Sequence, residues 1–169
     1  MKQRIAVFIF LTFISSTYVS ACECNSQGPF LSVAPNSKLV ALVKVTRYLS
    51  FKEIDRIKTP MSMEVEVIKI YKGHESRKKV IVWGDNGMLC RPYLSQFDTK
   101  QYYVIAFEKG NTGRGNTGEK ETDYAISICG DYWLKADFKK KMASGHVSED
   151  QQSIRLSEIK AKLGMSLPQ

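Results

Sequence analysis

The sequence predicts a mainly β domain, a five-stranded Greek-key barrel with a C-terminal α-helix and two disulfides. Five segments of the 169-residue chain are rich in β-branched and aromatic residues, a composition typical of strands. One later segment has apolar residues at helical spacing. Four cysteines follow an apolar N-terminal segment, which indicates export and disulfide formation. The length suits a single domain.

Residues 1–21 predict a secretory signal peptide. Lys2 and Arg4 precede an almost wholly apolar run over residues 5–14, and small residues lead to Ala21. An uncleaved membrane anchor is the alternative, but a spanning helix needs about 20 apolar residues and this run is shorter. Cleavage leaves residues 22–169 as a secreted or periplasmic domain. It also removes two positive charges from a net charge of +8, and the remaining charge indicates little beyond solubility.

The string Val19-Ser20-Ala21-Cys22 also resembles the lipobox of bacterial lipoproteins. Lipid modification of Cys22 would anchor the domain to the cell envelope, and only then do we expect membrane contact. It would also leave three cysteines, and therefore one odd thiol, in an oxidising compartment. The even count favours ordinary cleavage, and the lipid-anchored envelope protein stays as the alternative.

The first two strands are predicted at residues 38–51 and 61–71. Both segments are rich in β-branched residues and alternate in part between apolar and polar positions. In the second segment the alternation changes phase between Val67 and Ile68. A one-residue change of phase predicts a bulge that bends the strand, as a closed barrel requires.

Three further strands are predicted at residues 79–83, 101–108 and 124–129. The third ends at Gly84-Asp85-Asn86-Gly87, whose Asn-Gly pair is a strong turn signal. Five strands of this kind are typical of the OB architecture. Residues 110–118 then form a hairpin loop, and the match of Gly113-x-Gly115-x-x-Gly118 to the dinucleotide-binding motif is accidental, because that motif must open a helix.

A helix is predicted near the C-terminus. Ser148-Glu149-Asp150-Gln151 has the form of a capping box, and Gly164 can end the helix. Leu156, Ile159 and Leu163 form a narrow apolar stripe at helical spacing, which fits a helix lying on a barrel. The preceding lysine run at residues 139–141 is expected to be a solvated surface.

Candidate catalytic residues are few. The two histidines, His74 and His146, lie in polar, loop-like surroundings without the spacing of a metal site or of a nucleophile's base. The sequence contains no nucleophile elbow, metalloprotease helix or phosphate-binding loop. We therefore expect a binding or inhibitory protein rather than an enzyme, with no cofactor.

Two ligand classes follow from an OB-like barrel, oligonucleotides and oligosaccharides. Secretion argues against nucleic acid, and most aromatic residues lie within strand patterns, where core packing explains them. An oligosaccharide-binding barrel without inhibitory activity stays as an alternative. Its candidate exposed aromatic residues are Tyr93, Tyr132 and Trp133.

The cysteines predict two long-range disulfides. Cys22 and Cys24 are too close to pair with each other without strain, so each should reach either Cys90 or Cys129. Two connectivities are therefore open, and each bridge could contribute about 4 kcal/mol in the chain-entropy model. A zinc site is the competing interpretation, but this spacing is not the usual paired one.

Several segments together resemble the N-terminal, netrin-like domain of the tissue inhibitors of metalloproteinases, over nearly the whole of residues 22–169. Taken together, the segments look like those of a bacterial member of this family. The segments, in order, are Cys22-Glu23-Cys24, Ile68-Lys69-Ile70-Tyr71-Lys72-Gly73, the isolated Cys90, Tyr102-Tyr103-Val104-Ile105-Ala106, and Ile126-Ser127-Ile128-Cys129 followed by Trp133.

The resemblance implies a netrin-like barrel with Cys22–Cys90 and Cys24–Cys129 pairs. It also implies that the α-amino nitrogen and carbonyl oxygen of Cys22 chelate the catalytic zinc of a partner metalloproteinase, since such a zinc keeps an open coordination position. Glu23 would enter the specificity pocket beside the zinc, where the family usually has a small hydroxyl residue. The family's third N-domain disulfide and its cysteine-rich C-terminal domain have no counterpart here.

The partner is thus expected to be a zinc metalloproteinase or another extracytoplasmic protein. The residues expected to contact it lie in two segments, the N-terminal ridge and a loop after the third strand. They are Cys22, Glu23, Cys24 and Asn25 in the first, and Met88, Leu89 and Arg91 in the second.

Overall fold

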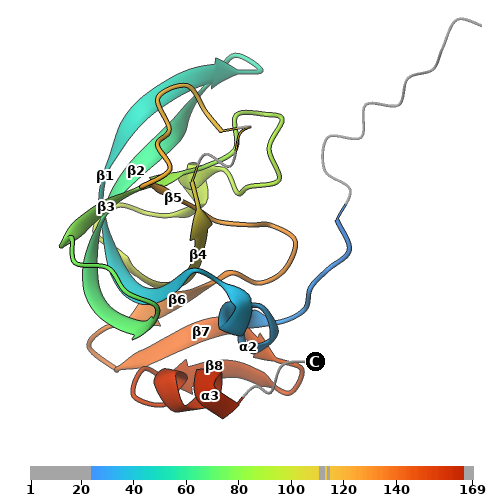
Figure 1. Ribbon diagram of the computed structural model, residues 1–169, viewed down its shortest axis with the longest axis vertical. Coiled ribbons are helices and arrows are strands. Elements are labelled where there is room, and N and C mark those ends of the chain that lie inside the picture. Colours follow the sequence, from blue (N-terminus) through green and yellow to red (C-terminus); the bar gives the residue numbers. More distant parts are fainter. Residues whose placement is uncertain (1–23, 111–112, 114, 166–169) are drawn as a thin grey trace, which may run out of the picture.

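The structure is a computed structural model that describes residues 24–110, 113 and 115–165. Its centre is a closed five-stranded barrel in the order β1-β2-β3-β5-β4, with β4 pairing back onto β1 (Figure 1). The predicted mainly β barrel is therefore confirmed. The five strands are β1 (Leu39–Ile54), β2 (Ile57–Lys72), β3 (Lys79–Trp83), β4 (Tyr102–Lys109) and β5 (Tyr124–Ala125).

Strands β1 and β2 form a long bent hairpin. Each has 16 residues, and the turn between them places Asp55 and Arg56 in the left-handed region at φ 50° and 65°. The predicted bulge is confirmed, because Leu42 pairs with Lys69 while Val43 pairs with Val67. The residue between these partners is Ile68, and the bend at this point helps β2 to follow the curvature of the barrel.

The barrel closes through two different contacts. The first half of β1 pairs with β4 from Leu39↔Phe107 to Lys44↔Tyr102. At the other side, β5 pairs in parallel with β3 and antiparallel with β4, through two residue pairs in each case. The predicted strand at 124–129 is thus too long, since β5 ends at Ala125 and the chain then turns toward the N-terminal segment.

Side chains reinforce the short strand β5. Trp83 donates its indole N–H to Asp123 at 2.9 Å, and Tyr124 donates its hydroxyl to Glu75 at 2.8 Å. Arg77 pairs with Glu75 at 2.6 Å and also donates to the carbonyl of Thr122 at 2.7 Å. These bonds connect the loop before β3 to β5, where the backbone ladder alone is short.

The sheet continues beyond the barrel. Strands β6 (Trp133–Asp137), β7 (Met142–Ser148) and β8 (Gln151–Arg155) follow one another outward from β4. Ser148 pairs with Gln151 across a turn made by Glu149 and Asp150, so the helix start predicted at Ser148 is wrong. A polar four-residue string can cap a helix or close a hairpin, and pairing along β7 favours the hairpin here.

The C-terminal helix α3 (Ile159–Met165) is shorter than predicted. The predicted apolar stripe is nonetheless buried, with exposed fractions of 7% for Leu156, 0% for Ile159 and 8% for Leu163. Helix α3 contacts β2 and the 3-10 helix η2 (Ala34–Asn36). The lysine run at 139–141 is exposed in the turn between β6 and β7, as expected.

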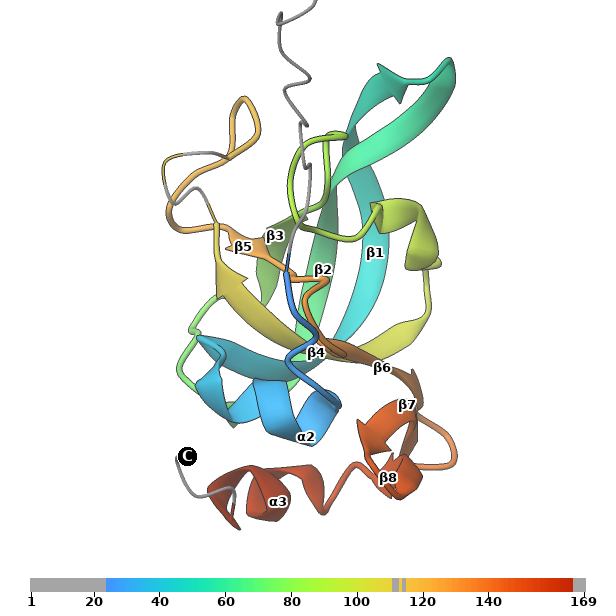
Figure 2. The same ribbon diagram turned by 90° about the vertical axis from the view of Figure 1, so that its right-hand side faces the viewer.

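The N-terminal helix α2 (Phe30–Val33) contacts β7 and leads through η2 into β1, while the 3-10 helix η3 (Leu94–Gln96) contacts β2. Figure 2 shows α2, α3 and the β7–β8 hairpin gathered at the end of the barrel opposite the β1–β2 turn. Within the described part of the chain, no helix is long and apolar enough to cross a membrane. The largest fully buried side chains include those of Phe30, Met63, Phe97, Ile105, Phe107 and Leu134.

Glu75 gives the fold a specific pH dependence. Hydrogen bonding from Arg77 is the main reason that its pKa falls from 4.5 to about 2. A carboxylate with a lowered pKa stabilises the fold above its unfolded pKa, and this contribution is lost as the pH falls toward 2. We expect Glu75→Gln to lower the free energy of unfolding by about 1–2 kcal/mol at pH 7 and by much less near pH 2.5.

Urea unfolding at the two pH values tests this expectation. The matched control is Glu149→Gln, because Glu149 is exposed in the β7–β8 turn. A difference between wild type and Glu75→Gln that is equal at both pH values, or no larger than that of the control, would contradict it.

Candidate functional site

The first described residues lie along the segment that follows β5. Cys24 forms a disulfide with Cys129, with the two Cα atoms 5.6 Å apart. Next to this bridge, Gln27 donates its backbone N–H to the carbonyl of Cys129 at 2.6 Å. Asp131 donates in turn to the carbonyl of Gly28 at 3.1 Å. Figure 2 shows this blue segment running from α2 across the front of the barrel.

A third segment, the loop after β3, lies against the same place. Ile128 donates its backbone N–H to the carbonyl of Cys90 at 3.3 Å. The loop is held in shape from within, since Asp85 accepts the N–H of Leu89 at 2.6 Å and Asn86 accepts the N–H of Met88 at 3.1 Å. We call residues 24–28, 88–91 and 127–131 together the cysteine surface.

The cysteine surface contains residues that the sequence analysis assigned to partner binding. Cys24 and Asn25 are exposed, and Met88 is 76% exposed. Leu89 is partly buried. The structure therefore brings the expected N-terminal and loop residues to one face. The N-terminal segment is held there by the disulfide to Cys129, and the loop by the hydrogen bond from Ile128, the neighbouring residue.

Arg91 differs from this group because it points into the protein. Its side chain is only 12% exposed and pairs at 2.8 Å with Glu119, whose side chain is fully buried. Glu119 also accepts the backbone N–H of Asn116 at 2.7 Å, and Asn116 donates its side-chain amide to the carbonyl of Gly84 at 3.0 Å. The structure thus gives Arg91 a role in holding the loop in place, which leaves little of it for a partner.

Ile128 belongs to the surface although the sequence analysis placed it inside a strand. It is 42% exposed, because β5 ends three residues earlier. The sequence signal that could have found it is its position directly before Cys129. A cysteine that bridges to an exposed segment also brings its neighbours toward the surface.

A recess adjoins the cysteine surface. It has a volume of about 550 Å³, and its lining includes Cys90, Ser127, Lys38 and Glu108. Burial is the main cause that raises the pKa of Glu108, and a hydrogen bond from Ser37 and the charge of Lys72 oppose this shift. The recess combines charged residues of both signs with apolar ones such as Ala125 and Ile126, so it suits a partner side chain that has both an apolar part and a hydrogen-bonding group.

Two of the predicted site residues, Cys22 and Glu23, lie outside the described residues. The Cys24–Cys129 bridge of the predicted pairing is present, and the Cys22–Cys90 bridge stays a prediction. None of the three described cysteines is a free thiol. Since disulfides persist mainly in oxidising compartments, the bridge indicates an extracytoplasmic location.

The histidines lie in different settings. His74 is exposed in the loop after β2, as expected. His146 lies on β7, not in a loop, and its Nδ1 is 2.7 Å from a carboxylate oxygen of Asp131. Among the described residues, no group of three or more His, Cys, Asp or Glu side chains is arranged to hold a metal ion.

The aromatic residues considered for sugar binding do not share an exposed face. Tyr132 is 5% exposed and donates its hydroxyl to Gln27 at 2.6 Å. Trp133 is partly buried and packs on Phe97 with ring centroids 5.3 Å apart. Of the three, only Tyr93 is exposed, at 38%.

Comparison with known protein families and curated proteins identified no relative of this chain. No protein-family model matches the chain, and no curated protein matches it.

The Arg91–Glu119 pair generates a stability prediction. Glu119→Gln removes the charge that compensates a largely buried guanidinium, so we expect it to lower the free energy of unfolding by about 2–3 kcal/mol. Hydrogen exchange of residues 84–91 should also become faster, because the loop loses its internal anchor. Glu121→Gln is the matched control, since Glu121 is exposed two residues away. Equal stabilities of the two variants would show that the pair does not hold the loop.

Proposed function

We propose that this protein is an extracytoplasmic inhibitor of zinc metalloproteinases that binds through the cysteine surface, in the manner that its resemblance to the tissue inhibitors of metalloproteinases implies. One observation carries the proposal. The Cys24–Cys129 bridge holds an exposed N-terminal segment beside the loop at residues 88–91.

The arrangement supports binding because it is ordered before a partner arrives. Residues 24–28 are fixed by one disulfide and by hydrogen bonds to Cys129 and Asp131. A segment that is already fixed loses little conformational entropy on association. Met88 and Ile128 add exposed apolar side chains beside it, and apolar groups of this kind favour the desolvated centre of an interface.

The Cys24–Cys129 bridge limits how far the proposed zinc-binding group, the α-amino end of Cys22, can lie from the cysteine surface. Two residues span at most about 7 Å, so a mature N-terminus at Cys22 stays close to the bridge at Cys24. In the proposed complex, the α-amino nitrogen and carbonyl oxygen of Cys22 occupy the open coordination position of the partner's zinc. An α-amino group has a pKa near 8, so losing its proton at neutral pH costs only about 1–2 kcal/mol.

In the proposed complex, Glu23 determines which metalloproteinases the protein inhibits best. Desolvating a carboxylate in an apolar pocket is costly unless the charge is paired. We therefore expect the best target to offer a cationic or hydrogen-bond-donating group in its specificity pocket. Enzymes with wholly apolar pockets should be inhibited poorly.

Inhibition by two matched chains tests the proposal. One chain begins at Cys22 with a free amine, and the other carries one additional alanine before it. Against a panel of zinc proteinases, we expect the first chain to inhibit at least one enzyme, and the extension to weaken that inhibition at least 100-fold. The extension displaces the amine without changing the residues of the cysteine surface.

The controls separate the possible failures. Circular dichroism and intact mass must show that both chains are folded and carry the same disulfides. If both leave every enzyme fully active, or both inhibit equally, zinc chelation by Cys22 is wrong. A lipid adduct on Cys22 in the native product would favour the envelope-anchored alternative, because the lone pair of an acylated nitrogen is delocalised into the amide group and no longer binds a metal well.

A further inference from the structure

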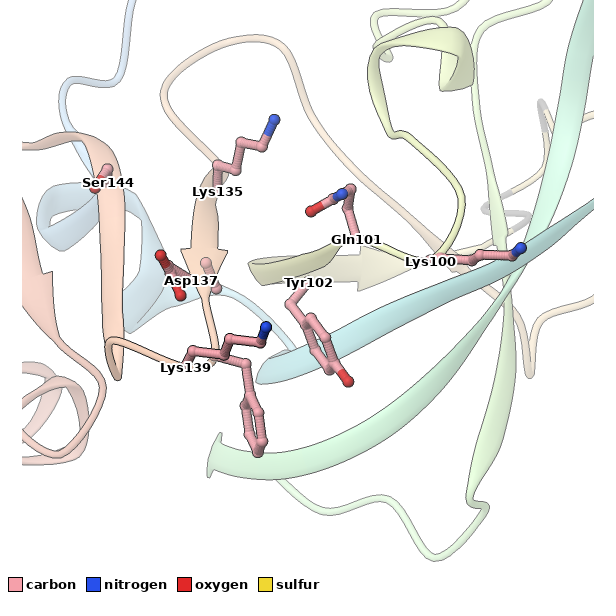
Figure 3. Close-up of a pocket in the computed structure, with 9 residues that line it drawn as sticks. Lys100, Gln101, Tyr102, Lys135, Asp137, Lys139 and Ser144 are labelled. Atoms are coloured by element: carbon pink, nitrogen blue, oxygen red, sulfur yellow. The ribbon is translucent and has the colours of Figure 1, made fainter.

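A second pocket lies beside the start of β4, the end of β6 and the strand β7. Its volume is about 530 Å³, within the range typical of small-molecule sites. Figure 3 shows residues from the β4 side and from the β6 side facing one another across this space. Its lining includes Lys100, Tyr102, Lys135, Phe138 and Lys139.

An aromatic stack forms one wall of the pocket. The rings of Tyr102 and Phe138 are nearly parallel, with an interplanar angle of 16° and centroids 5.0 Å apart. The ammonium group of Lys44 lies 5.6 Å from the centre of the Tyr102 ring. Phe138 remains 48% exposed in the turn after β6. It therefore presents a flat apolar surface at the edge of the pocket.

Three lysines line the pocket, and Figure 3 shows that their side chains point in different directions, with Lys139 extending toward Tyr102. Lys100 and Lys139 are exposed, and the side chain of Lys135 is 63% exposed. Lys100 adopts a left-handed φ of 67° and is held there by a backbone hydrogen bond to Val45 at 2.7 Å. Such a conformation is uncommon for a residue with a side chain and is found often at binding sites.

The nearby acids do not neutralise the lysines. Asp137 accepts the backbone N–H of Lys140 at 3.0 Å and pairs with its ammonium at 3.6 Å, and that backbone bond is the main reason its pKa is lowered. Asp98 lies 3.8 Å from Lys135, and both side chains are more than 60% exposed. Exposed pairs of this kind contribute little, so the pocket keeps a positive charge.

We propose that this pocket binds an acidic oligosaccharide, a chain of sugar rings that carry carboxylate or sulfate groups. The exposed ring of Phe138 suits the apolar C–H face of a sugar ring, and the lysines suit its anionic groups. No arginine is among the described residues that line the pocket, although arginine is the residue best suited to hold phosphates through two hydrogen bonds.

This site is separate from the cysteine surface. The pocket includes Tyr102, at the start of β4. The cysteine surface lies toward the other end of this strand, because Ala106 donates its backbone N–H to the carbonyl of Tyr132, the residue directly after that surface, at 2.8 Å. Four residues of strand span about 13 Å. The inference therefore goes beyond the proposed inhibition and does not depend on it.

Titration calorimetry with tetragalacturonate, an acidic sugar tetramer, tests the inference on the protein with its disulfides intact. We expect saturable binding that Lys139→Gln and Phe138→Ala each weaken at least tenfold. Lys140→Gln should leave the affinity unchanged within twofold. This substitution removes the same charge from the same turn, but Lys140 does not line the pocket. The methyl ester of the tetramer, which lacks the charges, should bind at least tenfold more weakly.

Four results would overturn it. They are absence of saturable binding, equal weakening by Lys139→Gln and Lys140→Gln, equal affinity for the methyl ester, and tighter binding of polyphosphate or of single-stranded DNA than of the sugar. Thermal unfolding of each variant must match wild type, so that lost binding does not reflect lost structure. The chain extended by one N-terminal alanine should bind the tetramer normally, which distinguishes this site from the inhibitory one.

Discussion

The pairing of β1 with two neighbours is the constraint on which the rest of the structure depends. One edge of β1 follows β2, and the other edge pairs with β4, so the sheet closes on itself. The bulge at Ile68 helps the long strands to bend enough for this. Because β4 is a barrel strand and also carries β6, its two ends position separate features. The loop to β5 and the cysteine surface lie toward one end, and the lysine-lined pocket lies toward the other.

The Cys24–Cys129 bridge converts a chain end into part of this framework. It closes a loop of 105 residues in sequence separation, so it removes much conformational freedom from the unfolded chain. In the folded state it holds residues 24–28 where Gln27 and Asp131 complete the backbone bonds. The loop at 88–91 is fixed independently, through the buried Glu119. Two rigid segments from distant parts of the sequence thereby form one exposed face.

The sequence predicted the elements whose pattern is local. The strands β1 to β4 and the bulge at Ile68 followed from alternation, and the Cys24–Cys129 pair followed from a family resemblance. The β7–β8 hairpin could not be predicted in this way, because the string at residues 148–151 suits a helix cap and a hairpin turn equally well. Only pairing with neighbouring strands decides between the cap and the turn. The internal role of Arg91 was also unpredictable, since its partner Glu119 lies 28 residues away beyond a glycine-rich loop that has no regular pattern.

The central claim is that the mature N-terminus is an unmodified Cys22 held on the barrel by two bridges. Peptide mapping by mass spectrometry, on the unreduced protein from its native host, tests this claim most directly. The account predicts one linked peptide that joins Cys24 to Cys129, a second that joins Cys22 to Cys90, and an unmodified α-amino group. A link between Cys24 and Cys90, a lipid on Cys22, or a chain that still carries residues 1–21 would contradict it.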